Sequence, residues 1–284
     1  SIYGKFSFSR LCAEAGVCDD FAEPAESILT KAFSKLVAVD SRRWIKFLTD
    51  ILPRFSCELA ASLPDFEKRM LQMFYITVFQ EAADWRSHTA QANMQLLADS
   101  PIMMRELYAL LALNLERIDF IDQPVPLGFD CPLDLHCTYT RDQILIAMDY
   151  MTPKNVREGV KWLPDKQVDV FFITLNKADK DYSPTTMYND YSINESLFHW
   201  QSQSTTSDTA STGQRYINHR QRGSRVVLFV REFKQDSIGA APYTCLGTAA
   251  YVKHTGSRPM NITWHLDQPI PAKYLRKTNK LVVG

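Results

Sequence analysis

The chain lacks the common signatures of nucleotide hydrolysis and of hydrolytic catalysis. It contains no G-x-x-x-x-G-K-[ST] loop, no G-x-G-x-x-G turn, no H-E-x-x-H motif and no G-x-S-x-G elbow. His199 has no recognisable nucleophile or carboxylate beside it in the sequence, so we interpret it as a hydrogen-bonded residue and not as a general base. The sequence therefore predicts a binding chain that is not itself an enzyme.

Paired metal-binding cysteines are also missing. The six cysteines are Cys12, Cys18, Cys57, Cys131, Cys137 and Cys245, and none forms a C-x-x-C pair. Cys131 and Cys137 flank His136, but zinc sites use tighter spacing and a second pair. We expect reduced and mostly buried thiols, no metal site, no cofactor in this chain, and a cytoplasmic protein.

No apolar run approaches the roughly 20 residues of a membrane span, and no secretory signal is visible, so we expect no membrane partner. The chain begins with Ser1 and not with Met, and we therefore expect it to be a piece of a longer protein. A hydrophobic content of 45% is ordinary for a globular protein of this length and allows a sizeable core.

The net charge is zero only because two unlike halves cancel. Residues 1–125 carry 13 Lys and Arg against 17 Asp and Glu, whereas residues 126–284 carry 19 against 15. From Arg215 onward the balance is 12 against 3. This asymmetry indicates an anionic partner for the C-terminal part, although a solvated basic face would give the same count.

The periodicity of apolar residues predicts an α+β protein with a helical bundle in residues 1–125 and a twisted β-sheet or small, twisted β-barrel in residues 126–284. The proline and glycine residues in the segment 122–128 indicate the boundary between these two parts. Helices are predicted near 28–37, 41–52, 64–78, 100–115, 141–150 and 272–280, and strands near 168–175, 197–203, 225–233, 244–252 and 261–266. The pair Asp40-Ser41 and the residue Thr140 are predicted to cap two of the helices.

Aromatic residues run directly into amides and hydroxyls in the block FHWQSQST at 198–205. Aromatic faces beside convergent donors and acceptors suit a nucleobase. We predict that Tyr188, Tyr191 and Trp200 stack on a base and that Asp190, Gln201 or Gln203 meets its polar edge. Buried tyrosines with satisfied hydroxyls are the alternative. The residues predicted to hold phosphates are Ser204, Thr205, Arg215, Arg222, Lys253 and Arg258.

Longer motifs carry a family resemblance. The segment 168–200, GQRYINH at 213–219 and LFVREFK at 228–234, with the long run 241–266, resemble an uncharacterised domain family. That family lies at the C-terminus of large bacterial superfamily-II helicases, often behind a phospholipase-D-type nuclease. The resemblance covers about residues 128 to 284, and residues before it are more loosely similar to a segment that follows the helicase core.

The resemblance implies a target-recognition region of SauUSI-like type IV restriction enzymes, which cleave DNA containing 5-methyl- or 5-hydroxymethylcytosine. It implies an SRA-like or PUA-like barrel that flips the modified base into an aromatic pocket. The implied partners are double-stranded DNA with modified cytosine and the helicase and nuclease domains of the same polypeptide, where ATP and Mg²⁺ would act. A homodimer through the helical part is a further expectation.

Two alternatives remain open from the sequence. The chain could read unmodified DNA or RNA, in which case methylation would not change its affinity. It could instead be a protein-interaction domain that regulates an attached helicase, with the Trp200 block as part of its core.

Overall fold

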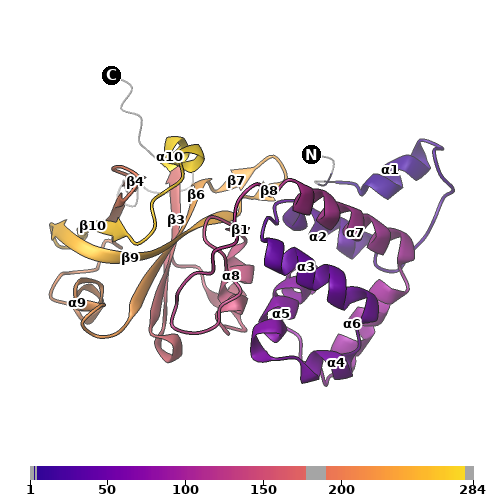
Figure 1. Cartoon of the computed structure of the whole chain (residues 1–284), viewed down its shortest axis with the longest axis horizontal. Coiled ribbons are helices and arrows are strands. Elements are labelled where there is room, and N and C mark those ends of the chain that lie inside the picture. Colours follow the sequence, from indigo (N-terminus) through magenta and orange to yellow (C-terminus); the bar gives the residue numbers. More distant parts are fainter. Residues whose placement is uncertain (1–2, 4, 177–189, 279–284) are drawn as a thin grey trace. The chain divides into compact units, whose positions relative to one another are not determined.

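The computed structural model describes residues 3, 5–176 and 190–278, and these form two compact units (Figure 1). The first, called the helical unit here, comprises residues 1–124, 130–156 and 235–242. The second, the sheet unit, comprises residues 125–129, 157–234 and 243–284. The chain therefore passes between the units more than once.

The helical unit is built from amphipathic helices whose apolar sides form its core. Its helices are α1 (Phe8–Glu14), α2 (Glu26–Leu36), α3 (Arg42–Ile51), η2 (Leu52–Arg54), α4 (Cys57–Ser62), α5 (Asp65–Phe79), α6 (His88–Ala98), α7 (Pro101–Glu116), α8 (Arg141–Ala147) and η3 (Pro153–Asn155). The short strands β1 (Thr138–Tyr139), β7 (Gln235–Asp236) and β8 (Gly239–Ala240) also belong to it. Ser41 and Thr140 cap α3 and α8 as predicted, because each side chain accepts from a backbone N–H three residues on.

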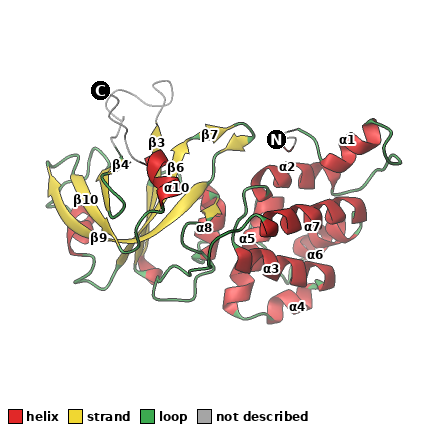
Figure 2. Cartoon of the chain, turned by 45° about the horizontal axis from the view of Figure 1, so that its top comes forward, coloured by secondary structure: helices red, strands yellow, loops and turns green. Residues whose placement is uncertain are grey.

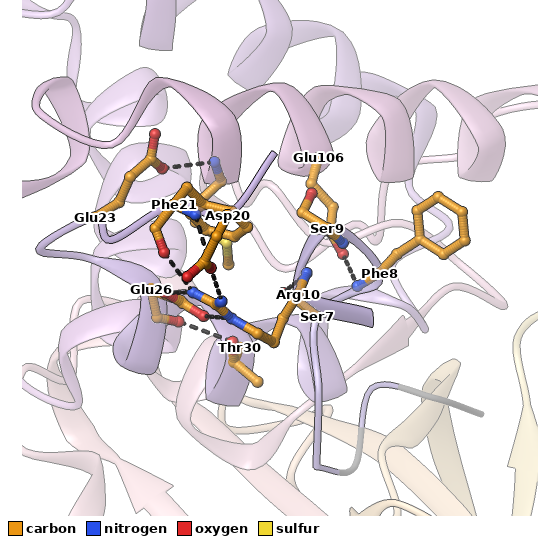
Figure 3. Close-up of polar contacts among 11 residues, drawn as sticks. Ser7, Phe8, Ser9, Arg10, Asp20, Phe21, Glu23, Glu26, Thr30 and Glu106 are labelled. Carbon is orange, nitrogen blue, oxygen red and sulfur yellow. Dashed lines mark hydrogen bonds and ion pairs between the residues drawn. The ribbon is translucent and has the colours of Figure 1, made fainter. Parts of the chain in front are cut away.

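Carboxylates bind helix ends in the N-terminal part of this unit (Figure 3). Glu106 on α7 accepts from the amides of Phe8 and Ser9 at 2.6 and 2.8 Å, at the first turn of α1. Glu23 in turn accepts from the first-turn amides of α7 at 2.7 and 2.9 Å. Arg10 pairs with Asp20 and Glu26, both at 2.6 Å. The orphan donors of two helices are thus satisfied by acidic groups from distant sequence.

The sheet unit contains one sheet in the order β2-β3-β6-β9-β10-β5-β4. The strands are β2 (Val160–Leu163), β3 (Val168–Asn176), β4 (Tyr191–Ser192), β5 (Leu197–Gln201), β6 (Arg225–Phe233), β9 (Tyr243–Thr255) and β10 (Asn261–Leu266). Helices η4 (Pro164–Lys166), α9 (Ser211–Asn218) and α10 (Ala272–Thr278) complete the unit. β3 and β6 run parallel, and the other neighbours are antiparallel.

The sheet is open, which differs from the predicted closed barrel. Closure requires the first and last strands to pair along a continuous ladder. Here the edges are β2 and β4, of four and two residues, and they do not pair with each other in the described part of the chain. Figure 2 shows the strands as a curved sheet, with β9 as a long bent ribbon. The mixed α+β class and the N-terminal helical region are as predicted.

The largest group of aromatic side chains in the sheet unit packs on one face of this sheet. Phe171, Phe198, Trp264 and Leu228 are fully buried there, together with Tyr216 from α9. All five predicted strands are present, and the six predicted helices correspond to α2, α3, α5, α7, α8 and α10. The sequence pattern missed the helices α1, α4, α6 and α9 and the short strands β1, β2, β4, β7 and β8.

Candidate functional site

One face of the strands β5 and β10 is polar because their residues alternate strictly. On β5, Phe198 and Trp200 point into the core, whereas Leu197, His199 and Gln201 are half-buried on the opposite face. β10 repeats the pattern, with buried Ile262, Trp264 and Leu266 between half-buried or exposed residues. At β5 and β10 the sheet therefore has one buried, apolar face and one polar face.

Strand register brings the polar side chains into rows. Tyr191, His199, Thr263 and Lys253 are successive partners across β4, β5, β10 and β9. The rings of Tyr191 and His199 stack, with centroids 4.8 Å apart and planes 15° apart. In the next row, Gln201 faces Asn261, and its Nε2 donates to the Asn261 Oδ1 at 3.0 Å. We call the set Tyr191, His199, Gln201, Lys253, Asn261 and Thr263 the polar sheet face.

A bulge in β9 aligns Lys253 with this face. The register between β10 and β9 shifts so that Thr263 faces Lys253 while the next residue, Trp264, faces Tyr251. Val252 is the extra residue and is 46% exposed. The bulge lets Tyr251 pack on the core while Lys253 remains an exposed cation beside Thr263.

A hydroxyl-rich loop docks at one end of the polar sheet face. Arg258 donates its backbone N–H to the Thr206 carbonyl at 3.1 Å, and Ser202 exchanges two 2.9 Å bonds with Met260. The Ser257 hydroxyl donates to Asp208 at 3.0 Å, and this bond, with His254 nearby, lowers the pKa of Asp208. The loop 202–210 and the turn 255–259 are therefore held together by both backbone and side chains.

Four of the predicted phosphate-binding residues belong to this end of the sheet unit. Ser204 and Thr205 are exposed on the loop, Arg258 is exposed on the adjoining turn, and Lys253 is exposed on β9. Hydroxyls and cations that project from neighbouring segments suit the oxygens of phosphates. The arrangement thus combines an aromatic and amide surface with a basic, hydroxyl-rich margin.

The predicted base-binding residues do not form one cluster. Tyr191 and Gln201 lie on the polar sheet face, but Trp200 is 5% exposed and packs on Phe171 with centroids 4.3 Å apart. Asp190 is buried and accepts the Gln201 backbone N–H at 2.9 Å. Tyr188 lies outside the described residues.

Gln203 belongs to the loop 202–210, where its side chain accepts from the Thr206 hydroxyl at 3.3 Å and also bonds the buried Tyr216. Its hydrogen bonds connect the loop to the core of the sheet unit. The prediction that Gln203 meets the edge of a base would use the amide donor and acceptor positions that these two bonds leave.

The sequence pattern did not predict His199 as a ring that stacks on a ligand. The signal was present in the alternation of LFHWQ, because residues 198 and 200 share one face and 199 must take the other. His199 and Trp200 are consecutive rings, and the prediction chose Trp200 because it is the larger. In the structure Trp200 belongs to the buried core.

Arg215 is held by an ion pair inside the unit. Its guanidinium donates two bonds, at 2.7 and 2.9 Å, to the carboxylate of Asp169, which is 0% exposed. It also lies 4.4 Å from the centre of the Trp162 ring. Burial raises the pKa of Asp169, and the bond to Arg215 opposes that shift. A phosphate contact by Arg215 stays a prediction and would compete with this pair.

Arg222, by contrast, is exposed in the turn that follows α9. The helix α9 begins just beyond the loop 202–210, so Arg222 lies at the far end of the helix from Ser204 and Thr205. Four of the six predicted phosphate-binding residues therefore lie near the loop 202–210, and Arg222 lies beyond the other end of α9. Arg215, on α9 itself, is paired with Asp169.

The cysteines form no metal site in the described part of the chain, where no group of three His, Cys, Asp or Glu could hold an ion. Cys131 and Cys137 each bond a backbone carbonyl through the thiol, and burial raises the pKa of Cys131 to about 12. Protonated, buried thiols are poor metal ligands and poor nucleophiles. No helix in the described residues has the length and apolar character that a membrane crossing needs.

Comparison with known proteins supplies a family but no activity. A search of curated proteins finds no match to the chain. One family model, described as a domain of unknown function (DUF3427), matches residues 133–277. The match covers about half of the chain, including the strands from β2 to β10 and all of the polar sheet face. The chain therefore belongs to the DUF3427 family.

Proposed function

We propose that the sheet unit is a DNA-recognition module that binds duplex DNA containing modified cytosine and serves an ATP-dependent type IV restriction enzyme. The observation that carries the proposal is the stacked pair Tyr191 and His199 on a half-buried polar face, with Gln201 two residues further along β5 and Lys253 two strands away in the same row. Flat rings offer stacking to any base, and neighbouring amides offer selectivity.

Base recognition would use Gln201 and Asn261 as the polar edge. An amide side chain offers a carbonyl acceptor for the amino group of cytosine and an NH₂ donor for its ring nitrogen. The bond between Gln201 and Asn261 fixes the orientation of both amides in the free protein at 3.0 Å. A base that leaves the helical stack and lies against His199 would therefore meet oriented amide groups.

Backbone binding would use the exposed basic and hydroxyl groups at the end of the face. Lys253 and Arg258 are exposed, and Ser204 and Thr205 adjoin them. The excess of 12 Lys and Arg over 3 Asp and Glu after residue 214 favours the same anionic partner. Affinity should fall steeply with salt, since each neutralised phosphate contributes a slope of about −0.9.

Selectivity for a methyl group should be modest at each site. One methyl group in an apolar gap contributes about 1–3 kcal/mol, which corresponds to roughly 10- to 100-fold in affinity. Helicase and nuclease domains of the same polypeptide would supply ATP hydrolysis and strand cleavage, and this chain would select where they act.

The test is fluorescence anisotropy of the chain with three duplexes that differ only in one base: cytosine, 5-methylcytosine or 5-hydroxymethylcytosine. A salt concentration of about 150 mM weakens non-specific phosphate binding. Tighter binding to a modified duplex is the expected result. Equal affinity for all three would instead indicate a general nucleic-acid module, and no binding would favour the protein-interaction alternative, for which a core position of Trp200 was expected.

A further inference from the structure

The sheet unit contains a second polar feature, a cavity of about 490 Å³ beyond the C-terminal end of α9. It is lined by the turn after α9, the first residue of β6 and the adjoining part of β9. The residues that matter for its chemistry are Arg220, Ser224, Arg225, Thr248 and Asp267. None of them belongs to the polar sheet face.

The one carboxylate that lines this cavity is already satisfied. Asp267 accepts from the Arg220 guanidinium through Oδ1 at 2.6 Å and from the Thr248 hydroxyl through Oδ2 at 2.7 Å. Its backbone N–H also donates to the Thr248 carbonyl at 2.9 Å. Asp267 therefore neutralises Arg220, and each of its carboxylate oxygens already accepts one hydrogen bond.

Arg225 is the second cation, and it lacks such a partner. Its backbone is fixed by a 2.9 Å bond to the Gln167 carbonyl and by pairing with Val168 at the start of β6. Its side chain is half-buried, and no carboxylate or other acceptor among the described residues bonds the guanidinium. The cavity thus holds one neutralised and one uncompensated arginine.

Gly128 makes room for this guanidinium. A Cβ atom at Gly128 would lie 2.5 Å from the Arg225 Nη1, and the glycine has a φ of +82°, a conformation that other residues rarely adopt. The Arg225 guanidinium therefore packs against the backbone of Gly128. A cation that is partly removed from water without a counter-charge is unfavourable unless an anion binds to it.

We propose that this cavity binds a phosphate group, with Arg225 as its main ligand. The guanidinium fork donates two parallel hydrogen bonds to phosphate oxygens. Arg220 also lines the cavity, where Asp267 balances its charge and adds no net negative charge. The phosphate is either free in solution or part of a DNA backbone, and the second case rests on the proposed function.

The free-phosphate arm uses thermal unfolding of the full 284-residue chain in inorganic phosphate or in chloride at equal ionic strength. A ligand that binds only the folded state raises the melting temperature. We expect phosphate to stabilise the parent chain and Arg276→Ala, an exposed arginine of α10, and not to stabilise Arg225→Gln. Equal phosphate effects in Arg225→Gln and the parent, or no effect in the parent, would overturn the site.

A second variant covers the case in which Arg225→Gln does not fold. Arg225→Lys keeps the charge but loses the bidentate fork, so its response to phosphate should be weaker than that of the parent. A response as strong as that of the parent would mean that general charge and not the cavity geometry binds the anion.

The DNA arm measures the dependence of duplex affinity on salt. If the phosphate belongs to a DNA backbone, Arg225→Gln should reduce the slope of log K against log salt by about 0.9 and lower affinity about tenfold. A lost phosphate response with an unchanged slope would assign the cavity to free phosphate. A phosphate response in a chain that binds no DNA would keep the cavity and refute the proposed function.

Discussion

Tyr191 and His199 lie directly opposite each other on β4 and β5, and their rings stack with centroids 4.8 Å apart and planes inclined by 15°. The pair lies on the half-buried face, across the sheet from the core aromatics. Such a pair, bordered by amides and a lysine, is suited to extend its stack by one planar ligand.

Removal of His199 should reduce DNA binding without unfolding the chain. We expect His199→Ala to lower the affinity for the preferred duplex by about tenfold or more, because stacking contributes roughly 1–3 kcal/mol per base. The measurement is anisotropy at fixed salt. His88→Ala, an exposed histidine on α6, is the matched control and should bind as the parent does. Parent-like affinity in His199→Ala would remove the stacked pair from the site.

Trp200 should behave as a core residue. Trp200→Ala removes a ring that packs on Phe171 and Tyr216, and large-to-small changes of this kind cost about 3–5 kcal/mol. Urea unfolding should show a lower midpoint at an unchanged m-value. A variant with the stability of the parent and a lost affinity for DNA would instead support the stacking role that the sequence predicted for Trp200.

Arg215→Ala should destabilise the sheet unit, because it leaves the Asp169 carboxylate buried without its cation. Breaking one side of a buried ion pair costs about 3–5 kcal/mol. Burial already raises the pKa of Asp169, and loss of Arg215 should raise it further.

A native pKa above the unfolded value means that the native state binds more protons between the two values. Stability of Arg215→Ala should therefore be greatest below the unfolded pKa of Asp169 and fall as pH rises through the native pKa. Denaturant curves between about pH 4 and pH 7 test this, with Asp169→Asn/Arg215→Ala as the control that should lack the pH-dependent difference. A pH-independent deficit in Arg215→Ala would contradict the assignment.

His219 should make stability depend on pH in the opposite sense. Its Nε2 accepts the Tyr251 backbone N–H at 3.2 Å, so the proton of the neutral ring is on Nδ1, which faces the Ser224 carbonyl at 3.3 Å. Burial lowers the pKa of His219, and Arg220 adds to this while Asp267 opposes it.

The unfolded state then binds a proton below about pH 6.5 while the native state does not, so stability is lost as pH falls through that range. Melting temperatures from pH 8 to pH 5 should fall more for the parent than for His219→Asn. Parallel pH profiles for the two chains would show that His219 contributes nothing to the loss.

Glu106→Gln should release the first helix. The variant weakens the bonds to the Phe8 and Ser9 amides and also a bond with the Tyr3 hydroxyl, whose pKa burial and Glu106 together raise to about 12. Loss of a charged cap costs about 1–2 kcal/mol. Hydrogen exchange of α1 should accelerate, while exchange in α5 stays slow. Unchanged protection of α1 would show that the Arg10 pairs hold it alone.

The sequence by itself determined the elements whose pattern is regular. The apolar stripes of α2, α3, α5 and α7 and the caps Ser41 and Thr140 are local signals, and the long apolar runs of β3 and β6 have few competing structures. It also placed Tyr191 and Gln201 among the candidate ligand residues, because their polar neighbours are visible in the chain.

Only the tertiary structure decided which side chains share a face and which charges are already paired. Long-range register brings Tyr191, Thr263 and Lys253 into one row with His199, and a single extra residue at Val252 aligns the lysine. The Asp169 partner of Arg215 is 46 residues away, and the free Arg225 lies against Gly128. Charge and aromaticity are properties of single residues, whereas availability for a ligand depends on contacts that form only when distant segments pack together.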